Sequence, residues 1–90
     1  MMNPADVVKT EKAKAALANP ESMPGLVVTV WCGEDVDNVD SISTVLILEI
    51  DGTANDMNIT CYSEGYGIDV VHSDQLIDVL HRIELKGKVV

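Results

Sequence analysis

Residues 41–51 read Ser-Ile-Ser-Thr-Val-Leu-Ile-Leu-Glu-Ile-Asp, the longest strand-like run in the chain. Its β-branched and aliphatic residues favour a strand, in which side chains two positions apart point to the same face of the sheet. Continuous alternation assigns one face to Ile42, Thr44, Leu46, Leu48 and Ile50. The opposite face then receives Ser43, Val45, Ile47, Glu49 and Asp51. Because this run is the longest, we expect its strand to be central in the sheet.

Three further strands are predicted around this run. Residues 26–32 precede it, residues 57–62 and 66–72 follow it, and each segment alternates between two kinds of side chain. The side chains expected to face the core are Leu26, Val28, Val30, Cys32, Met57, Ile59, Cys61, Ile68 and Val70. The connections 52–56 and 63–65 are short and polar, as in β-hairpins. Four successive strands therefore predict an antiparallel meander.

A helix is expected on each side of the four strands. Asn3 can cap a helix with Pro4 at its first position, and the helix runs to about Ala18 before Asn19 and Pro20 end it. Its apolar stripe is thin, so we expect it to dock weakly. After the last strand, Ser73 can cap a second helix, which would cover the apolar face of the sheet. Its apolar residues recur at helical spacing: Leu76, Ile77, Leu80 and Ile83.

The predicted fold is α+β, a two-layer sandwich in which a four-stranded antiparallel β-meander carries an N-terminal helix and a C-terminal helix, in the order α-β-β-β-β-α. A chain of 90 residues has room for one modest core. We therefore expect one domain, with the N-terminal helix in residues 1–19, a linker in residues 20–25 and the α+β core in residues 26–90.

Charge is distributed very unevenly along the chain. The formal net charge is −9, and between Lys14 and Arg82 there are twelve Asp or Glu residues and no Lys or Arg. Such a segment projects a negative potential that attracts cationic partners and repels nucleic acid. The sequence therefore predicts no direct binding of DNA or RNA, and it favours a basic protein as the partner.

The acidic loop after the first strand is the predicted partner-binding site. Its carboxylates are Glu34, Asp35, Asp37 and Asp40, and in a meander Glu64 of the 63–65 hairpin would emerge at the same end. Counted as a calcium loop from Asp35, position six is Asp40 where glycine is needed, and position twelve is Leu46 where glutamate is needed. The loop therefore predicts an anionic surface and no calcium site.

No metal, cofactor or enzymatic activity is predicted. Candidate zinc ligands are Cys32, Cys61, His72 and His81, but no two of them form a Cys-x-x-Cys or His-x-x-x-His pair. Candidate catalytic residues are Ser63, Ser73 and the two histidines, but the chain has no nucleophile elbow, phosphate loop or His-Glu-x-x-His motif.

A second candidate surface is the face of the sheet predicted to point outward. It carries Trp31, Val45, Ile47, Tyr62 and Val71, and it is more apolar than a solvated face requires. Either the N-terminal helix covers it, or it is a homodimer or partner interface, in which Trp and Tyr are typical anchors.

Two functional hypotheses follow. The first is a small acidic inhibitor that occupies a basic nucleic-acid-binding surface of a partner, such as a nuclease or a CRISPR or restriction effector, by mimicking the charge of nucleic acid. In size and charge the chain resembles small phage-encoded inhibitors of such nucleases and the immunity proteins of nuclease toxins. The alternative is a non-catalytic structural or assembly module that homo-oligomerises through its outward sheet face.

The sequence also predicts a compartment. No run approaches the roughly 20 apolar residues that span a bilayer, and the first residues lack the pattern of a signal peptide. We therefore expect no membrane association and a cytoplasmic protein, in the host cytoplasm if the chain is phage-encoded.

Overall fold

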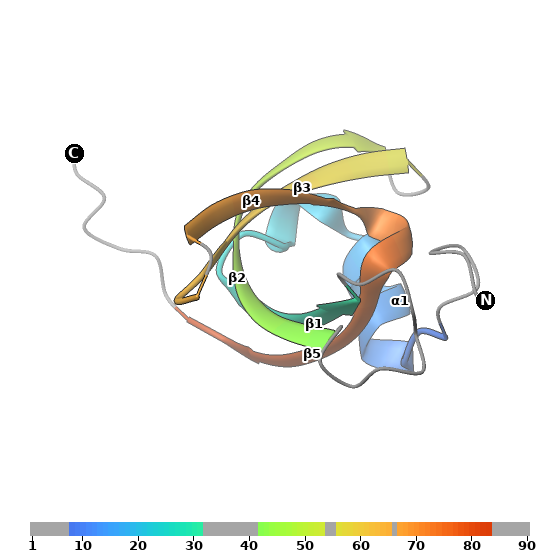
Figure 1. The fold of residues 1–90 in the computed structure, drawn as a ribbon. Coiled ribbons are helices and arrows are strands. Elements are labelled where there is room, and N and C mark those ends of the chain that lie inside the picture. The colour runs from blue at the N-terminus through green and yellow to red at the C-terminus, as the bar shows by residue number, and fades with distance from the viewer. Residues whose placement is uncertain (1–7, 32–41, 54–55, 66, 84–90) are drawn as a thin grey trace.

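The structure, a computed structural model, describes residues 8–31, 42–53, 56–65 and 67–83. One α-helix, two short 3-10 helices and five strands follow one another along the chain (Figure 1). The elements are α1 (Glu11–Leu17), η2 (Pro20–Ser22), β1 (Leu26–Trp31), β2 (Ile42–Thr53), β3 (Asp56–Ser63), β4 (Gly67–His72), η4 (Ser73–Gln75) and β5 (Leu76–Arg82). No helix among these described residues is long and apolar enough to cross a membrane.

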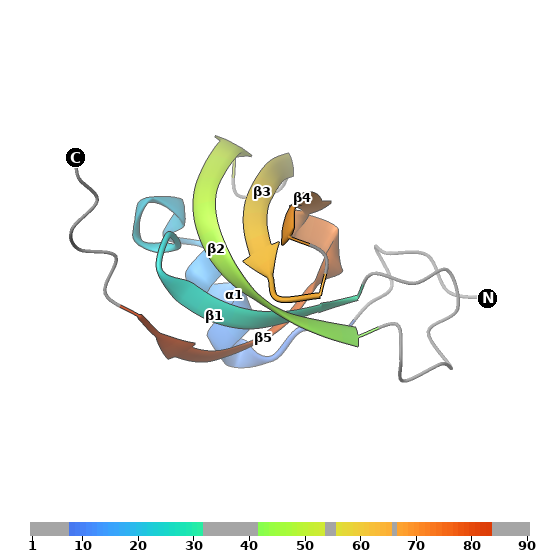
Figure 2. The same cartoon turned by 60° about the vertical axis from the view of Figure 1, so that its left-hand side comes forward.

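The five strands form one antiparallel sheet in the order β4-β3-β2-β1-β5. The sheet is strongly curved and wraps around the core, as Figures 1 and 2 show. The α+β class and the antiparallel sheet are confirmed, and β2 is the central strand, as its length predicts. The predicted four-stranded meander lacks the fifth strand of this sheet, β5, which pairs with β1.

One hydrophobic core fills the inside of the curved sheet and also receives residues that precede the first strand. Ala13 of α1 and Met23, from the predicted linker, are both fully buried in it. The largest buried side chains are Met23, Ile47, Met57, Ile59, Leu76, Val28, Val30 and Cys61. Ala16 and Leu17 pack against this cluster, so α1 and the segment after it belong to the same core as the sheet.

The predicted C-terminal helix is wrong, and two irregularities in β5 explain why. The register with β1 jumps between Val27 and Val28 and again between Thr29 and Val30, so that Leu80 and Ile77 are left out of the pairing. These bulges break the two-residue alternation of a strand and leave apolar doublets, which resemble helical spacing. Of the described residues after β4, only Ser73–Gln75 are helical, and they form one 3-10 turn.

The N-terminal helix begins later than predicted. Its N-cap is Thr10, whose side-chain oxygen accepts the N–H of Ala13 at 3.2 Å, and residues 1–7, including the predicted cap Asn3, lie outside the described part. Thr10 also donates its own N–H to the carbonyl of Ile77 on β5 at 2.9 Å, and its hydroxyl to Asp78 at 2.7 Å. The start of α1 is therefore attached to β5 by hydrogen bonds.

A β-bulge in β2 reverses the predicted faces of the residues that precede it. Ile47 pairs with Cys61 and Glu49 pairs with Thr60, so Leu48 is the extra residue. Without a bulge, alternation would place Leu46 on the same face as Ile50. Because Leu48 is inserted between them, Leu46 and the residues before it lie on the faces opposite to those predicted. Val45 and Ile47, predicted to point outward, are buried in the core with Ile50 packed against them.

The two faces of β4 are also reversed relative to the prediction. Val71 pairs with the core residue Ile59 and is itself buried, although the sequence places it outward. Ile68 and Val70, predicted to face the core, are 67% and 55% exposed. The register with β3 therefore overrides the apolar pattern within β4, where Ile68, Val70 and Val71 occupy both faces.

Candidate protein-binding surface

Of the five predicted partner-binding carboxylates, the structure describes only Glu64. Glu34, Asp35, Asp37 and Asp40 fall in residues 32–41, outside the described part. The strand residues that flank this segment, Trp31 and Ile42, are paired with each other. Glu64 is exposed in the turn after β3, and this turn lines the same groove as Ser43 and Thr44 at the beginning of β2.

All charged residues described from β2 through β4, histidine aside, are acidic, and all are exposed. They are Glu49, Asp51, Asp56, Glu64 and Asp69. We call the first four the acidic hairpin surface, because Asp69 pairs with the core residue Cys61 and therefore lies on the other face of the sheet. Glu49 and Asp51 lie on β2 opposite the neutral Thr60 and Asn58 of β3. Asp56 contacts His72, and Asp69 accepts the N–H of Val70 at 2.8 Å. Among the described residues, no side chain forms an ion pair with Glu49, Asp51 or Glu64.

Of the four described Lys and Arg residues, three are held elsewhere, and the fourth, Lys12, is exposed on α1. Lys9 donates to the backbone carbonyls of Ser73, Asp74 and Leu76 at 2.9–3.0 Å. Burial lowers the pKa of the Lys9 ammonium below its ordinary value of 10.5, and the charge of Asp74 opposes this shift.

Arg82 and Lys14 are likewise directed away from the acidic hairpin surface. Arg82 donates to the carbonyls of Pro24 and Ser22, and Lys14 pairs with Glu11 of its own helix at 3.2 Å. None of these interactions neutralises a carboxylate of β2, β3 or β4, so no described Lys or Arg compensates the acidic hairpin surface, in which Asp56 alone contacts a histidine.

Three of the five residues assigned to the outward face from the sequence are core residues. Val45, Ile47 and Val71 belong to the core cluster, and Trp31 is buried, with its backbone carbonyl accepting the Gln75 side chain at 2.7 Å. Tyr62 is the exception, with 44% of its surface exposed. Tyr62 is therefore the one member of this predicted set that is available to a partner.

The structure reveals an apolar row on the outer face, the side of the sheet away from the core. Val27 pairs with Leu46, Leu46 with Tyr62, and Tyr62 with Ile68, so four neighbouring strands each contribute one side chain. Sequence reasoning missed Leu46 and Ile68 because it assigned the phases of β2 and β4 incorrectly. The predicted alternation places Val27 on the correct face of β1, but the predicted candidate surface does not include it. The sequence held one signal for these residues: Tyr62 is predicted to point outward, and its cross-strand neighbours must share its face.

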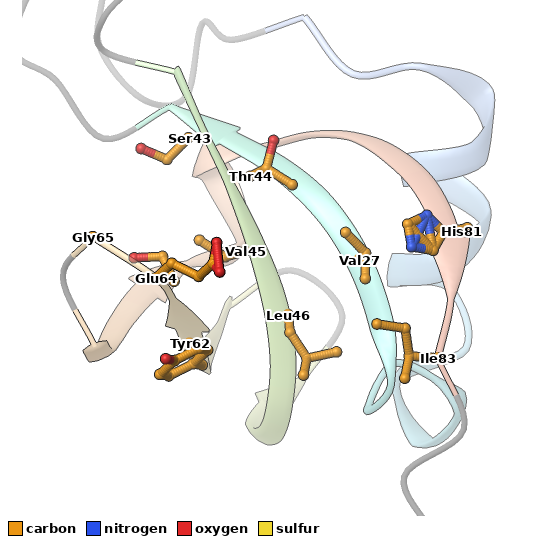
Figure 3. Close-up of a pocket in the computed structure, with 11 residues that line it drawn as sticks. Val27, Ser43, Thr44, Val45, Leu46, Tyr62, Glu64, Gly65, His81 and Ile83 are labelled. Atoms are coloured by element: carbon orange, nitrogen blue, oxygen red, sulfur yellow. The ribbon is translucent and has the colours of Figure 1, made fainter.

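A groove of about 610 Å³ lies along part of this row (Figure 3). Val27, Leu46, Tyr62 and Ile83 supply apolar surface, and Glu64 stands at the side formed by the β3–β4 turn. The remaining lining residues are Ser43, Thr44, Val45, Ser63, Gly65 and His81.

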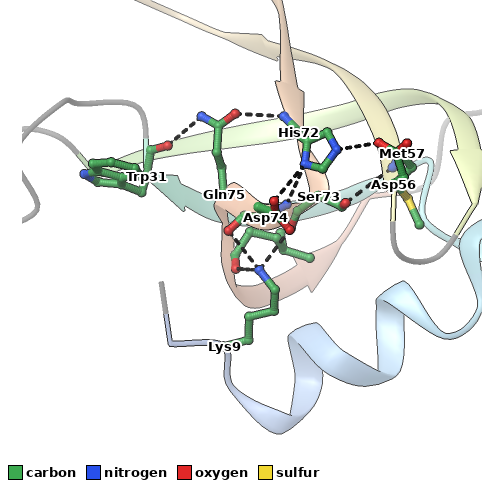
Figure 4. A network of polar contacts seen from close by, with 9 residues as sticks. Lys9, Trp31, Asp56, Met57, His72, Ser73, Asp74 and Gln75 are labelled. Atoms are coloured by element: carbon green, nitrogen blue, oxygen red, sulfur yellow. Dashed lines mark hydrogen bonds and ion pairs between the residues drawn. The ribbon is translucent and has the colours of Figure 1, made fainter. Parts of the chain in front are cut away.

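A polar network around η4 contains two of the residues weighed for catalysis (Figure 4). His72 Nδ1 accepts the N–H of Asp74 at 3.1 Å, which leaves Nε2 to donate to Asp56 at 2.8 Å. The Ser73 hydroxyl is buried and accepts the N–H of Met57 at 3.3 Å. Both imidazole nitrogens and the hydroxyl are thus engaged in holding the 3-10 turn.

The residues considered as zinc ligands are distributed over separate parts of the fold. Cys61 is buried in the core, His72 caps η4, His81 lies exposed on β5, and Cys32 falls outside the described residues. Within the described ranges, no three His, Cys, Asp or Glu side chains are grouped so as to hold a metal ion. Comparison with protein-family models, curated proteins and solved structures gives no match.

Proposed function

We propose that this chain is a small non-catalytic binding protein that occupies a basic, nucleic-acid-binding surface of a partner protein. The observation that supports the proposal is the segregation of charge: the four exposed carboxylates of the acidic hairpin surface lie on β2, β3 and the turn after β3, while the described Lys9, Lys14 and Arg82 are engaged elsewhere and Lys12 lies on α1. A surface of this kind offers a cationic cleft the charge it would otherwise receive from a phosphate backbone.

The physical consequences of such a surface are specific. Strand pairing fixes the backbone positions of Glu49 and Asp51, so little backbone order has to be created there on binding. Attraction over several ångströms speeds association, and salt screens it with a Debye length of about 10 Å at 0.1 M. The sequence adds four more carboxylates, Glu34, Asp35, Asp37 and Asp40, between β1 and β2, outside the described residues.

The test is affinity capture from nuclease-treated host lysate at low and high salt. The charge variant carries Glu49→Gln and Asp51→Asn, two exposed carboxylates of β2 without a described partner. The matched control carries Glu11→Gln and Glu21→Gln, which removes the same charge outside the sheet. A further variant replaces Asp35, Asp37 and Asp40 with Asn.

We expect wild type and the matched control to capture the same basic, nucleic-acid-handling protein at low salt and to release it at high salt or with added DNA. The charge variant should retain much less of it, because each lost carboxylate removes one contact to the cationic surface. Equal capture by the charge variant, the loop variant and wild type would contradict the proposal.

A second candidate function, self-assembly, rests on a different observation. β4 is an edge of the sheet, and its Ile68 and Val70 are largely exposed. Edge strands with apolar side chains are templates for pairing with another chain. Replacing Ile68 and Val70 with Ser should convert an assembly into monomers in sedimentation velocity, whereas a wild-type chain that stays monomeric at high concentration would eliminate this candidate.

A further inference from the structure

The groove on the outer face combines apolar surface with a single type of charge. Tyr62 and Ile83 are 44% and 43% exposed, and Leu46 is half-buried between them. None of these three belongs to the core cluster. Their apolar surface therefore remains available to another molecule. The volume of the groove, about 610 Å³, falls in the range of clefts that bind ligands.

The charge around the groove restricts what can enter it. Among the described residues that line it, Glu64 is the one carboxylate, His81 is the one imidazole, and none is Lys or Arg. Glu49 stands on β2 three residues after Leu46. A second copy of this chain would bring another net charge of −9 to the same place. Like charges at an interface disfavour that pairing, whereas Lys or Arg on an incoming chain would be complementary.

We propose that the groove receives a large apolar side chain from an extended segment of the partner protein, and that a neighbouring Lys or Arg of this segment pairs with Glu64. This inference rests on the proposed function and adds the partner's chemistry: a basic surface from which one aliphatic or aromatic side chain projects. The acidic hairpin surface directs the encounter, and the contacts with Leu46 and Tyr62 slow dissociation. Buried apolar anchors of this kind dominate the energy of many interfaces.

Three capped synthetic pentapeptides test the groove without knowledge of the partner. The first alternates lysine and leucine, the second alternates lysine and serine, and the third alternates glutamate and leucine. Each is titrated into the isotope-labelled full chain, and amide chemical shifts are followed by NMR. Tyr62→Ser and Leu46→Ser remove apolar surface from the groove, Glu64→Gln removes its charge, and Asn58→Ser is the control on the same face outside the groove.

We expect the lysine–leucine peptide to bind most tightly and to shift the amides of Val27, Leu46 and Tyr62. Tyr62→Ser and Leu46→Ser should each weaken it about tenfold, which corresponds to about 1.4 kcal/mol. Glu64→Gln should weaken it about threefold and reduce its salt dependence, and Asn58→Ser should leave the affinity unchanged.

Equal affinity of the lysine–leucine and lysine–serine peptides, shifts confined to residues outside the groove, or no binding of any peptide would overturn the inference. The peptide comparison on the wild-type chain stands even if a groove variant fails to fold. If partner capture still requires Glu49 and Asp51 while the groove variants capture normally, the groove assignment is wrong and the proposed function stands. Loss of salt-sensitive capture by the wild type would instead remove the proposed function itself.

Discussion

Leu46 and Ile47 are adjacent in β2, and their replacement by alanine should have very different effects on stability. Ile47 is fully buried in the core, whereas Leu46 is half-buried on the outer face. Truncating a buried Ile to Ala costs about 2–5 kcal/mol, because the lost transfer free energy is joined by that of the cavity left behind. At Leu46 we expect less than about 1 kcal/mol, because solvent and neighbouring side chains can occupy the space.

The assay is urea denaturation followed by far-UV circular dichroism and by the fluorescence of the buried Trp31. A domain of this size has a free energy of unfolding of roughly 5–13 kcal/mol, so Ile47→Ala should lower the transition midpoint clearly and Leu46→Ala only slightly. The m-value should change little in either variant. If Leu46→Ala cost as much as Ile47→Ala or more, the bulge at Leu48, the inward orientation of Ile47 and the outer-face groove would all be contradicted.

Three further outcomes are expected. Gly52→Ala should cost about 1–3 kcal/mol more than Gly67→Ala in the same assay: both glycines have positive φ, +119° and +75°, but a Cβ added at Gly52 would collide with the Asp56 carbonyl oxygen, whereas Gly67 borders open space. Lys9→Met should lower the free energy of unfolding by about 1–3 kcal/mol and Lys12→Met, an exposed lysine, by about zero; equal effects would refute the anchoring of Lys9 by three carbonyls. The folded state binds the Lys9 proton less tightly than the unfolded chain does, because the pKa of Lys9 is lowered. The contribution of Lys9 to the free energy of unfolding should therefore increase as pH rises from this lowered pKa towards 10.5, and Lys9→Met should lack this increase.

The sequence predicts the positions of β1 to β4, their antiparallel order and the central place of β2, because alternating apolar residues and polar connections are local signals. It also predicts which side of β3 faces the core, since Met57, Ile59 and Cys61 alternate without interruption. β4 is regular as well, but its apolar residues Ile68, Val70 and Val71 occupy both faces, so its alternation alone does not indicate which face is buried.

The remaining errors come from bulges and long-range pairing. Leu48, Ile77 and Leu80 are extra residues in their ladders, and each interrupts the alternation that reveals a strand. Pairing of β5 with β1 joins residues about 50 positions apart, which no local pattern reports. The candidate surface inherited these errors: Glu64 is exposed as expected, whereas Val45, Ile47 and Val71 face the core.

The most direct test of the central claim is a competition measurement with the captured partner. The partner is bound to a fluorescently labelled nucleic acid, and its anisotropy is followed while wild type, Glu49→Gln/Asp51→Asn or Glu11→Gln/Glu21→Gln is added. We predict that wild type and the Glu11/Glu21 variant displace the nucleic acid at near-equimolar ratio at low salt, and that the Glu49/Asp51 variant requires a large excess. Formation of a ternary complex that retains the nucleic acid, or equal displacement by all three proteins, would contradict the claim that the acidic hairpin surface occupies a nucleic-acid-binding site.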